Sequence, residues 1–194
     1  MRTLQSICVF CGASPGNQPV YQEVAAALGR LLAQRGLRLV YGGGSIGLMG
    51  ALAKAVHAEG GEILSIIPYS LVPKEIAGPS LGQLMLCDTM LERKELMGQH
   101  ADAFIVLPGG YGTLDELFEM VTWTQLGIHS KPLGLLNING YFDGLVQFLD
   151  HMASAGFVRP KHRDLVLVDT DVMLLLDRLA TQELPESIVQ WQKK

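Results

Sequence analysis

The sequence predicts an α/β fold, a single Rossmann-like domain in which a doubly wound parallel sheet of about seven strands carries helices on both faces. Short apolar runs alternate with longer amphipathic stretches along the chain, which is the pattern of β-α-β units. The 22 glycines among 194 residues exceed the usual level of about 7%. They are gathered at the ends of the apolar runs, where phosphate-binding turns lie in parallel sheets.

Each strand is assigned to a short apolar run, and each helix to a stretch with apolar residues at helical spacing. The first helix has Val24, Leu28 and Leu31 at this spacing and ends at Gly36. Strict alternation predicts right-handed connections and strands buried on both faces. The predicted strands are 7–11, 37–41, 63–67, 84–87, 103–107, 133–137 and 165–168. The predicted helices are 20–34, 47–59, 89–100, 113–125, 142–155 and 172–179.

Composition favours one globular domain over residues 1–194, with 185–194 as a loose tail or a dimer contact. The chain is 48% hydrophobic and 18% charged, enough to bury a core, and its net charge of -4 argues against a nucleic-acid-binding surface. Apolar runs such as 104–107 are far shorter than the roughly 18 residues of a membrane span. The first residues lack a signal-peptide pattern. We therefore expect a cytoplasmic protein that binds neither nucleic acid nor a membrane.

The three cysteines and five histidines predict neither a disulfide framework nor a metal site. Cys8 and Cys11 form a C-x-x-C within a predicted strand, where their side chains point to opposite faces. We expect both to be buried hydrophobes in a reducing compartment rather than a redox pair. The histidines are scattered without an i, i+4 pair, so no metal is expected.

Two glycine motifs match known signatures but lack a necessary part. Residues 12–16 fit the G-x-S-x-G of serine hydrolases, but Ser14 is followed by Pro15, which has no N–H for an oxyanion hole. Residues 42–47 fit G-x-G-x-x-G, but the nearest acid, Glu62, stands at the start of the next strand and not at its end. Ser14 either donates a hydrogen bond to a ligand or belongs to a simple turn. The second loop is expected to approach a ligand or a helix closely.

Residues 108–116 (PGGYGTLDE) are the strongest candidate for a ligand site. Their glycines leave backbone N–H groups at the start of a predicted helix, which suits a phosphate. Two interpretations of Glu116 stay open. With Thr113 as N-cap it completes a T-x-x-E capping box. Alternatively, its carboxylate polarises a water or stabilises a cationic transition state.

Residues 90–94 (MLERK) follow the fourth predicted strand and therefore face the same rim of the sheet. Arg93 could clamp a phosphate or a ribose oxygen. The alternative is a solvated helix face on which Glu92 and Glu95 balance the charges of Arg93 and Lys94.

Taken together, these blocks resemble the LOG ("Lonely Guy") family of cytokinin-activating phosphoribohydrolases. Residues 108–116 look like its P-G-G-x-G-T-x-x-E signature, and 41–50 like its second glycine block. Residues 10–16 resemble its first loop and 92–94 its basic pair. The resemblance covers residues 5–180, and Ala13 departs from it because the family often has serine there.

The resemblance implies hydrolysis of the N-glycosidic bond of a purine nucleoside 5′-monophosphate, N6-prenylated AMP or AMP itself, to free base and ribose 5-phosphate. Arg93 and Glu116 are then the catalytic pair, and Gly109, Gly110, Gly112 and Thr113 bind the phosphate. The other residues placed at the substrate are Ser14, Gly44, Glu75, Met90, Lys94, Tyr111 and Thr122. Such proteins are often labelled lysine decarboxylases, but no lysine here is marked for a pyridoxal phosphate Schiff base.

The resemblance also implies a homo-oligomer, a dimer or a hexamer, with active sites near the subunit interface. Residues 90–97 and 113–125 are the candidate contacts, where exposed apolar side chains are expected. No cofactor or metal is expected, because water is the nucleophile and the phosphate does not react. The alternative function is a non-catalytic carrier of a nucleotide or phosphate-bearing cofactor, in which Glu116 only caps its helix.

Overall fold

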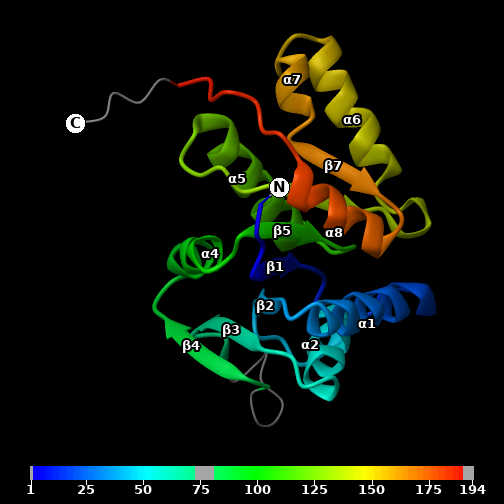
Figure 1. Cartoon of the computed structure of the whole chain (residues 1–194), viewed down its shortest axis with the longest axis vertical. Coiled ribbons are helices and arrows are strands. Elements are labelled where there is room, and N and C mark those ends of the chain that lie inside the picture. The colour runs from blue at the N-terminus through cyan, green and yellow to red at the C-terminus, as the bar shows by residue number, and fades with distance from the viewer. Residues whose placement is uncertain (1, 73–80, 190–194) are drawn as a thin grey trace.

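The computed structural model describes residues 2–72 and 81–189 and contains one seven-stranded sheet. Neighbouring strands are all parallel, in the order β4-β3-β2-β1-β5-β6-β7, which runs from bottom to top in Figure 1. The predicted doubly wound parallel sheet is therefore confirmed. The strands are β1 (Ser6–Phe10), β2 (Arg38–Tyr41), β3 (Ile63–Pro68), β4 (Gln83–Cys87), β5 (Ala103–Val106), β6 (Leu133–Leu136) and β7 (Val166–Asp169).

Helices cover both faces of the sheet, and in Figure 1 α4 and α5 lie to its left while α1 and α2 lie to its right. Each predicted helix and strand begins and ends within about two residues of its expected position, as the periodicity of each segment dictates. The short elements η1 and α7 were not predicted. The helices of the described residues are α1 (Pro19–Gln34), α2 (Gly47–Ala58), α4 (Met90–Gln99), α5 (Tyr111–Leu126), η1 (Ile138–Gly140), α6 (Asp143–Ser154), α7 (Pro160–Arg163) and α8 (Val172–Thr181).

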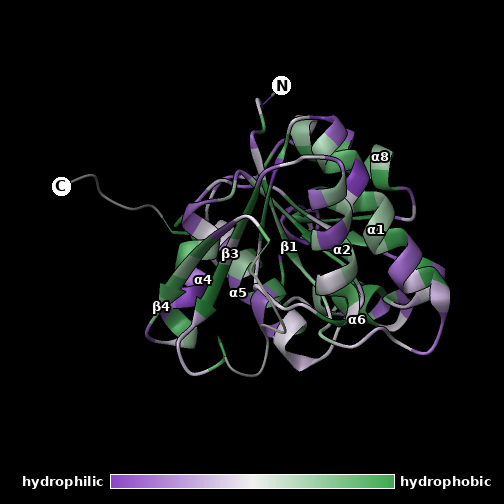
Figure 2. Cartoon of the chain, turned by 90° about the horizontal axis from the view of Figure 1, so that it is seen from below, coloured by the Kyte–Doolittle hydropathy of each residue, from purple (hydrophilic) through white to green (hydrophobic). Residues whose placement is uncertain are grey.

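Two hydrophobic cores lie on the two faces of the sheet. Ile7 and Val9 of β1 pack with α1, α2 and α8, whereas Cys8 and Phe10 pack with α4, α5 and α6. Cys11 belongs to the first core, so the predicted separation of Cys8 and Cys11 is confirmed, and both are buried free thiols. Figure 2 shows mainly hydrophobic strands between helices of mixed polarity, as expected for a sheet covered on both sides.

The sheet topology opens a crevice between β1 and β5. From β1 the chain moves outward to β4 and then returns to place β5 on the other side of β1. The connections that leave β1 and β5 therefore diverge, with α1 on one face and α5 on the other. Ligands of parallel α/β sheets bind in such a crevice, at the carboxyl ends of the strands.

The chain after α8 lies against helices of the upper half of the molecule in Figure 1. The Gln182 side chain donates to the Asp164 carbonyl (2.8 Å), and the Ile188 N–H donates to the Gln125 carbonyl (3.0 Å). The described part of the predicted loose tail, residues 185–189, thus makes specific contacts. Within the described ranges, no helix combines the length and the apolar character that crossing a membrane requires.

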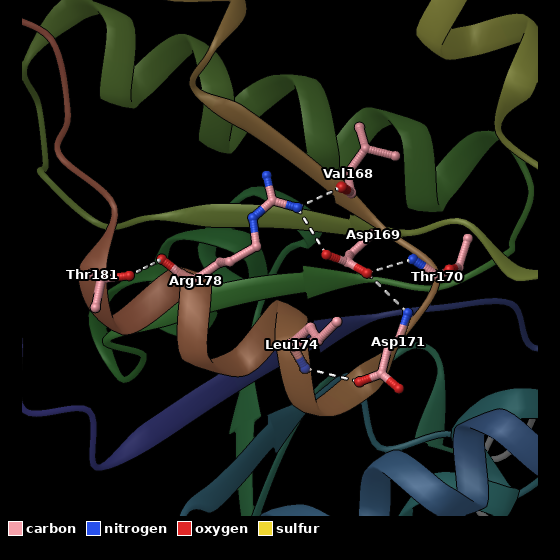
Figure 3. Close-up of polar contacts among 7 residues, drawn as sticks. All are labelled: Val168, Asp169, Thr170, Asp171, Leu174, Arg178 and Thr181. Atoms are coloured by element: carbon pink, nitrogen blue, oxygen red, sulfur yellow. Dashed lines mark hydrogen bonds and ion pairs between the residues drawn. The ribbon is translucent and has the colours of Figure 1, made fainter.

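A carboxylate at the end of β7 organises the turn into α8 (Figure 3). Asp169 accepts hydrogen bonds from the backbone N–H groups of Thr170 (2.8 Å) and Asp171 (3.0 Å) and pairs with Arg178 (2.8 Å). Asp171 in turn caps α8 by accepting from the Leu174 N–H (2.9 Å). The N–H of Asp171 first, and then Arg178 and Thr170, hold the pKa of Asp169 below its usual value.

We expect Asp169→Asn to lower the free energy of unfolding by about 1 kcal/mol at pH 7, because the amide keeps an acceptor for the turn but loses the charge. A carboxyl with a depressed folded pKa stabilises above its unfolded value of about 3.9, and this contribution is lost as the pH falls through the folded pKa. Urea unfolding at pH 7 and pH 3 should therefore give a difference from wild type that shrinks in acid. Asp164→Asn, at an exposed position, is the control. A difference independent of pH would contradict this role.

Candidate active site

A cavity of about 630 Å³ lies at the crevice between β1 and β5. Its wall consists mainly of residues 9–17, Gly42 after β2, and residues 108–116 other than 111 and 114. Other segments also contribute to the wall, among them Arg93 of α4 and Tyr141, which follows β6 and η1 in the chain. This volume is in the range of small-molecule sites, so the topology and the cavity indicate the same place.

The N-terminus of α5 presents an open anion site in this wall. Gly110 is the N-cap and, as a glycine, has no side chain to cap the helix start. The first N–H groups of an α-helix have no acceptor within it, and the helix dipole favours an anion beside them. A Cβ at Gly110 or Gly112 would meet no atom of the described residues within 4 Å, so packing among them does not require glycine there. Glycine at these positions leaves room for a ligand to approach the backbone.

The capping interpretation of Glu116 is wrong. Because α5 begins at Tyr111, Thr113 is the third helical residue and not the N-cap, and its side chain is buried beside Gly109. Glu116 is the sixth helical residue, beyond the first turn, and lines the cavity. The T-x-x-E capping box is therefore excluded, and the role of this carboxylate toward a ligand stays a prediction.

The second glycine block packs against the loop after β1, and the Gly12 carbonyl of that loop occupies the start of α2. The N–H groups of Leu48 (3.1 Å) and Met49 (3.4 Å) at the beginning of α2 donate to the Gly12 carbonyl. Gly47 has a φ of 61°, and a Cβ there would lie 2.2 Å from the Ala13 carbonyl oxygen. The expected close approach is therefore one between loop and helix.

Arg93 has a buried guanidinium at the rim of the sheet, so the solvated-face interpretation is wrong for this residue. Its side chain donates from Nε to the Ile66 carbonyl (3.1 Å) and from Nη2 to the Gly42 carbonyl (2.7 Å). These acceptors offset part of the cost of burying a charge. A Cβ at Gly42 would stand 1.9 Å from Nη2, so only glycine admits this arrangement.

The polar residues next to Arg93 in the sequence cap α4 or connect it to α5. Thr89 caps α4 by accepting from the Glu92 N–H (3.1 Å), and the Glu92 carboxylate accepts from the Asp88 N–H (2.7 Å). Lys94 joins α4 to α5 through Asp115 (2.9 Å) and Glu119 (3.2 Å) and is not part of the cavity wall. Partial burial lowers the pKa of Lys94, but its two carboxylate partners outweigh this and raise it.

The remaining candidates divide into three groups. Ser14, Met90, Gly109 and Thr113 line the cavity together with Gly110 and Gly112. Gly44, Tyr111 and Thr122 do not line it; Tyr111 is 95% exposed, and Gly44 is buried against Met49. Glu75 lies outside the described residues.

The sequence reasoning missed two tyrosines in the wall. Tyr21 of α1 and Tyr141, just after η1, both line the cavity, with ring centroids 5.9 Å apart. The Tyr141 hydroxyl donates to the Gly109 carbonyl (2.6 Å). The position of residues 137–141 after β6 was the available signal, since this loop also leaves the carboxyl edge of the sheet.

Cys11 lines the cavity as a neutral thiol. Burial raises its pKa far above the usual value, and the negative charge of Glu116 raises it further. Only a thiolate is an effective nucleophile, so Cys11 is part of the wall rather than a reacting group.

Comparison with known proteins agrees with this geometry. The family model described as "Possible lysine decarboxylase" matches residues 49–179. Cytokinin riboside 5′-monophosphate phosphoribohydrolase LOG2 of Arabidopsis thaliana is 50% identical over 89% of this chain and 81% of its own length. A second cytokinin riboside 5′-monophosphate phosphoribohydrolase of Arabidopsis thaliana, LOG7, is 49% identical over 91% of this chain and 82% of its own length.

Solved structures share the fold at much lower identity. The molybdenum cofactor carrier protein of Chlamydomonas reinhardtii has a TM-score of 0.69 and 18% identity, covering 93% of this chain and all of that one. The molybdenum cofactor binding protein of Rippkaea orientalis has a TM-score of 0.68 and 18% identity over 93% of this chain and 98% of its own. These likenesses concern the fold alone. The family match and the identity of about one half over nine-tenths of the sequence show that the chain belongs to the LOG family of cytokinin riboside 5′-monophosphate phosphoribohydrolases.

Proposed function

We propose that this protein hydrolyses the N-glycosidic bond of a purine nucleoside 5′-monophosphate, N6-prenylated AMP, AMP or both, to the free base and ribose 5-phosphate. The observation that carries the proposal is one cavity whose wall holds the Glu116 side chain, the buried Arg93 guanidinium and the open start of α5. The family membership supports the same reaction.

The 5′-phosphate binds the N-terminus of α5. Gly110, Gly112 and Thr113 supply backbone N–H groups, and the open space beside both glycines admits the phosphate oxygens. Ser14 and Met90 contact the nucleotide from neighbouring parts of the wall. Glu116 follows Thr113 by three residues, about 4.5 Å along the helix axis, which is the scale of one ribose ring.

Cleavage develops positive charge on the ribose, and the Glu116 carboxylate stabilises it. Glu116 also orients a water and takes its proton as the water oxygen bonds to C1′. The electron pair of the broken C1′–N bond leaves with the base, which receives the proton. The Arg93 guanidinium supplies a positive charge that steadies the substrate and the departing base.

We further propose that α4 and α5 form a homo-oligomer contact close to this site. Leu91 is 64% exposed on α4, and Met90 and Phe118 are also exposed. Tyr111 and Thr122 lie exposed on α5. An apolar patch beside a functional cavity is typical of a subunit contact. We also propose that the protein is cytoplasmic. Its three buried cysteines are free thiols, as is usual in a reducing compartment.

Glu116→Gln tests the function. We expect turnover to fall by at least about 100-fold, because glutamine can neither take a proton nor carry the charge, while AMP binding and thermal stability change little. The measurement is chromatographic release of base from AMP and from N6-isopentenyl-AMP, and the ratio between them gives the preference. Glu23→Gln, at an exposed site on α1, is the control. Full turnover in Glu116→Gln would remove its catalytic role, and no base release by wild type would favour the carrier.

Gly42→Ala tests the hydrogen bond that holds the Arg93 guanidinium at the Gly42 carbonyl. The methyl group would displace the guanidinium from the Gly42 carbonyl, so we expect kcat/KM to fall about tenfold or more. Gly144→Ala, whose methyl group would meet no atom of the described residues within 4 Å, is the matched control. In an Arg93→Ala background the Gly42→Ala change should cost nothing further, since the clash is gone. Additive losses would refute the coupling.

Leu91→Asp tests the oligomer contact. A charge on this exposed position should dissociate the assembly, and light scattering after size-exclusion chromatography should report a smaller mass than for wild type. Phe157→Asp, at an 87% exposed residue following α6, should leave the mass unchanged. An unchanged mass for Leu91→Asp would place the contact elsewhere.

A further inference from the structure

A turn with several side-chain hydrogen bonds holds the Tyr141 side chain against the loop between β5 and α5, residues 107–110. Asn137 accepts from the Phe142 N–H (2.7 Å), and its amide donates to Asp143 (2.7 Å). Asn139 has a φ of 50°, the positive value of a non-glycine residue, and donates to the Gln18 side chain (2.8 Å). A residue in this sparsely populated conformation is retained where the surrounding structure demands a particular chain path.

That path delivers the Tyr141 ring to the cavity. The ring packs edge-on against Tyr21, at 5.9 Å between centroids, and against Phe142 at 5.0 Å. Its hydroxyl donates to the Gly109 carbonyl at 2.6 Å. Aromatic pairs of this geometry are favourable beyond their buried area, so the ring is fixed before any ligand arrives.

The hydrogen bond acts on the peptide group that joins Gly109 to Gly110. A peptide group is planar, so anchoring its carbonyl also sets the direction of the Gly110 N–H. On its Gly109 side this peptide packs closely, since a Cβ there would stand 2.1 Å from the Thr113 hydroxyl oxygen, whereas on the Gly110 side a Cβ would meet no atom of the described residues within 4 Å. The Tyr141 hydroxyl is a side-chain contact that restrains this carbonyl, and the Gly110 N–H points to the opposite side within the same peptide plane.

We propose that Tyr141 is a positioning residue that pre-organises the Gly109–Gly110 peptide for the phosphate of the substrate. This inference rests on the proposed phosphate site at the start of α5. Tyr141 acts on affinity for the phosphate and not on bond cleavage, since its contact is with the loop and the reacting bond lies beyond the phosphate, beside Glu116.

Tyr141→Phe removes only the hydroxyl and keeps the ring contacts. We expect KM for the nucleotide to rise about three- to tenfold, the range of one hydrogen bond, with kcat within about twofold of wild type. By isothermal titration calorimetry, the Kd of ribose 5-phosphate should weaken by the same factor, whereas the Kd of adenosine, which lacks the phosphate, should not change. A purely structural role would lower the active fraction and hence kcat, and would leave the ratio of these Kd values as in wild type.

Tyr69→Phe, at a 60% exposed tyrosine outside the cavity wall, controls for loss of a hydroxyl and should leave every value unchanged. An unchanged Kd for ribose 5-phosphate in Tyr141→Phe would overturn the proposal, as would equal weakening of adenosine. The calorimetric arm does not need turnover. If wild type binds ribose 5-phosphate but releases no base, the hydrolase assignment fails while the role of Tyr141 is still decided by the same comparison.

Discussion

The backbone of Gly12 joins the two halves of the molecule at the end of β1. Its N–H donates to the Pro108 carbonyl (3.0 Å), and its carbonyl accepts from Leu48 (3.1 Å) and Met49 (3.4 Å) at the start of α2. A Cβ on Gly12 would stand 3.3 Å from the Gly109 Cα, so a larger residue would push the two loops apart. Because Gly12 satisfies the start of α2, the positive end of that helix is unavailable to a ligand, whereas the start of α5 stays open.

Two opposite charges meet the cavity at the carboxyl edge of the sheet. Burial raises the pKa of Cys8 in β1, and the negative charge of Glu116 raises it further, while the positive charge of Arg93 lowers it. Both charges are therefore close enough to influence the same thiol. Arg93 is 5% exposed and is held by carbonyl oxygens from the ends of β3 and β2. Electrostatic interactions are stronger in such a partly desolvated place than in water. A carboxylate and a guanidinium set there suit a reaction that separates charge between a ribose and a base.

The two T-x-x-E segments of the chain have the same spacing and different roles. In 89–92, Thr89 is the N-cap of α4 and Glu92 folds back to the preceding turn. In 113–116, the helix starts two residues earlier than Thr113, at Tyr111, with Gly110 as its N-cap. That shift of the helix start moves Glu116 out of the capping position and into the cavity wall.

The sequence by itself determined the alternating α/β sheet, the order of its elements and the loops that could hold a phosphate, because hydrophobic periodicity and glycine turns are local properties of the chain. Its glycine block 108–116 and Arg93 also marked the residues that the cavity brings together. Only the tertiary structure decided which helix start stays open, which of Arg93 and Lys94 is buried, and that Tyr141 belongs to the site. These outcomes rest on backbone contacts between distant segments, such as Arg93 with Gly42, 51 residues apart, and no local pattern encodes them.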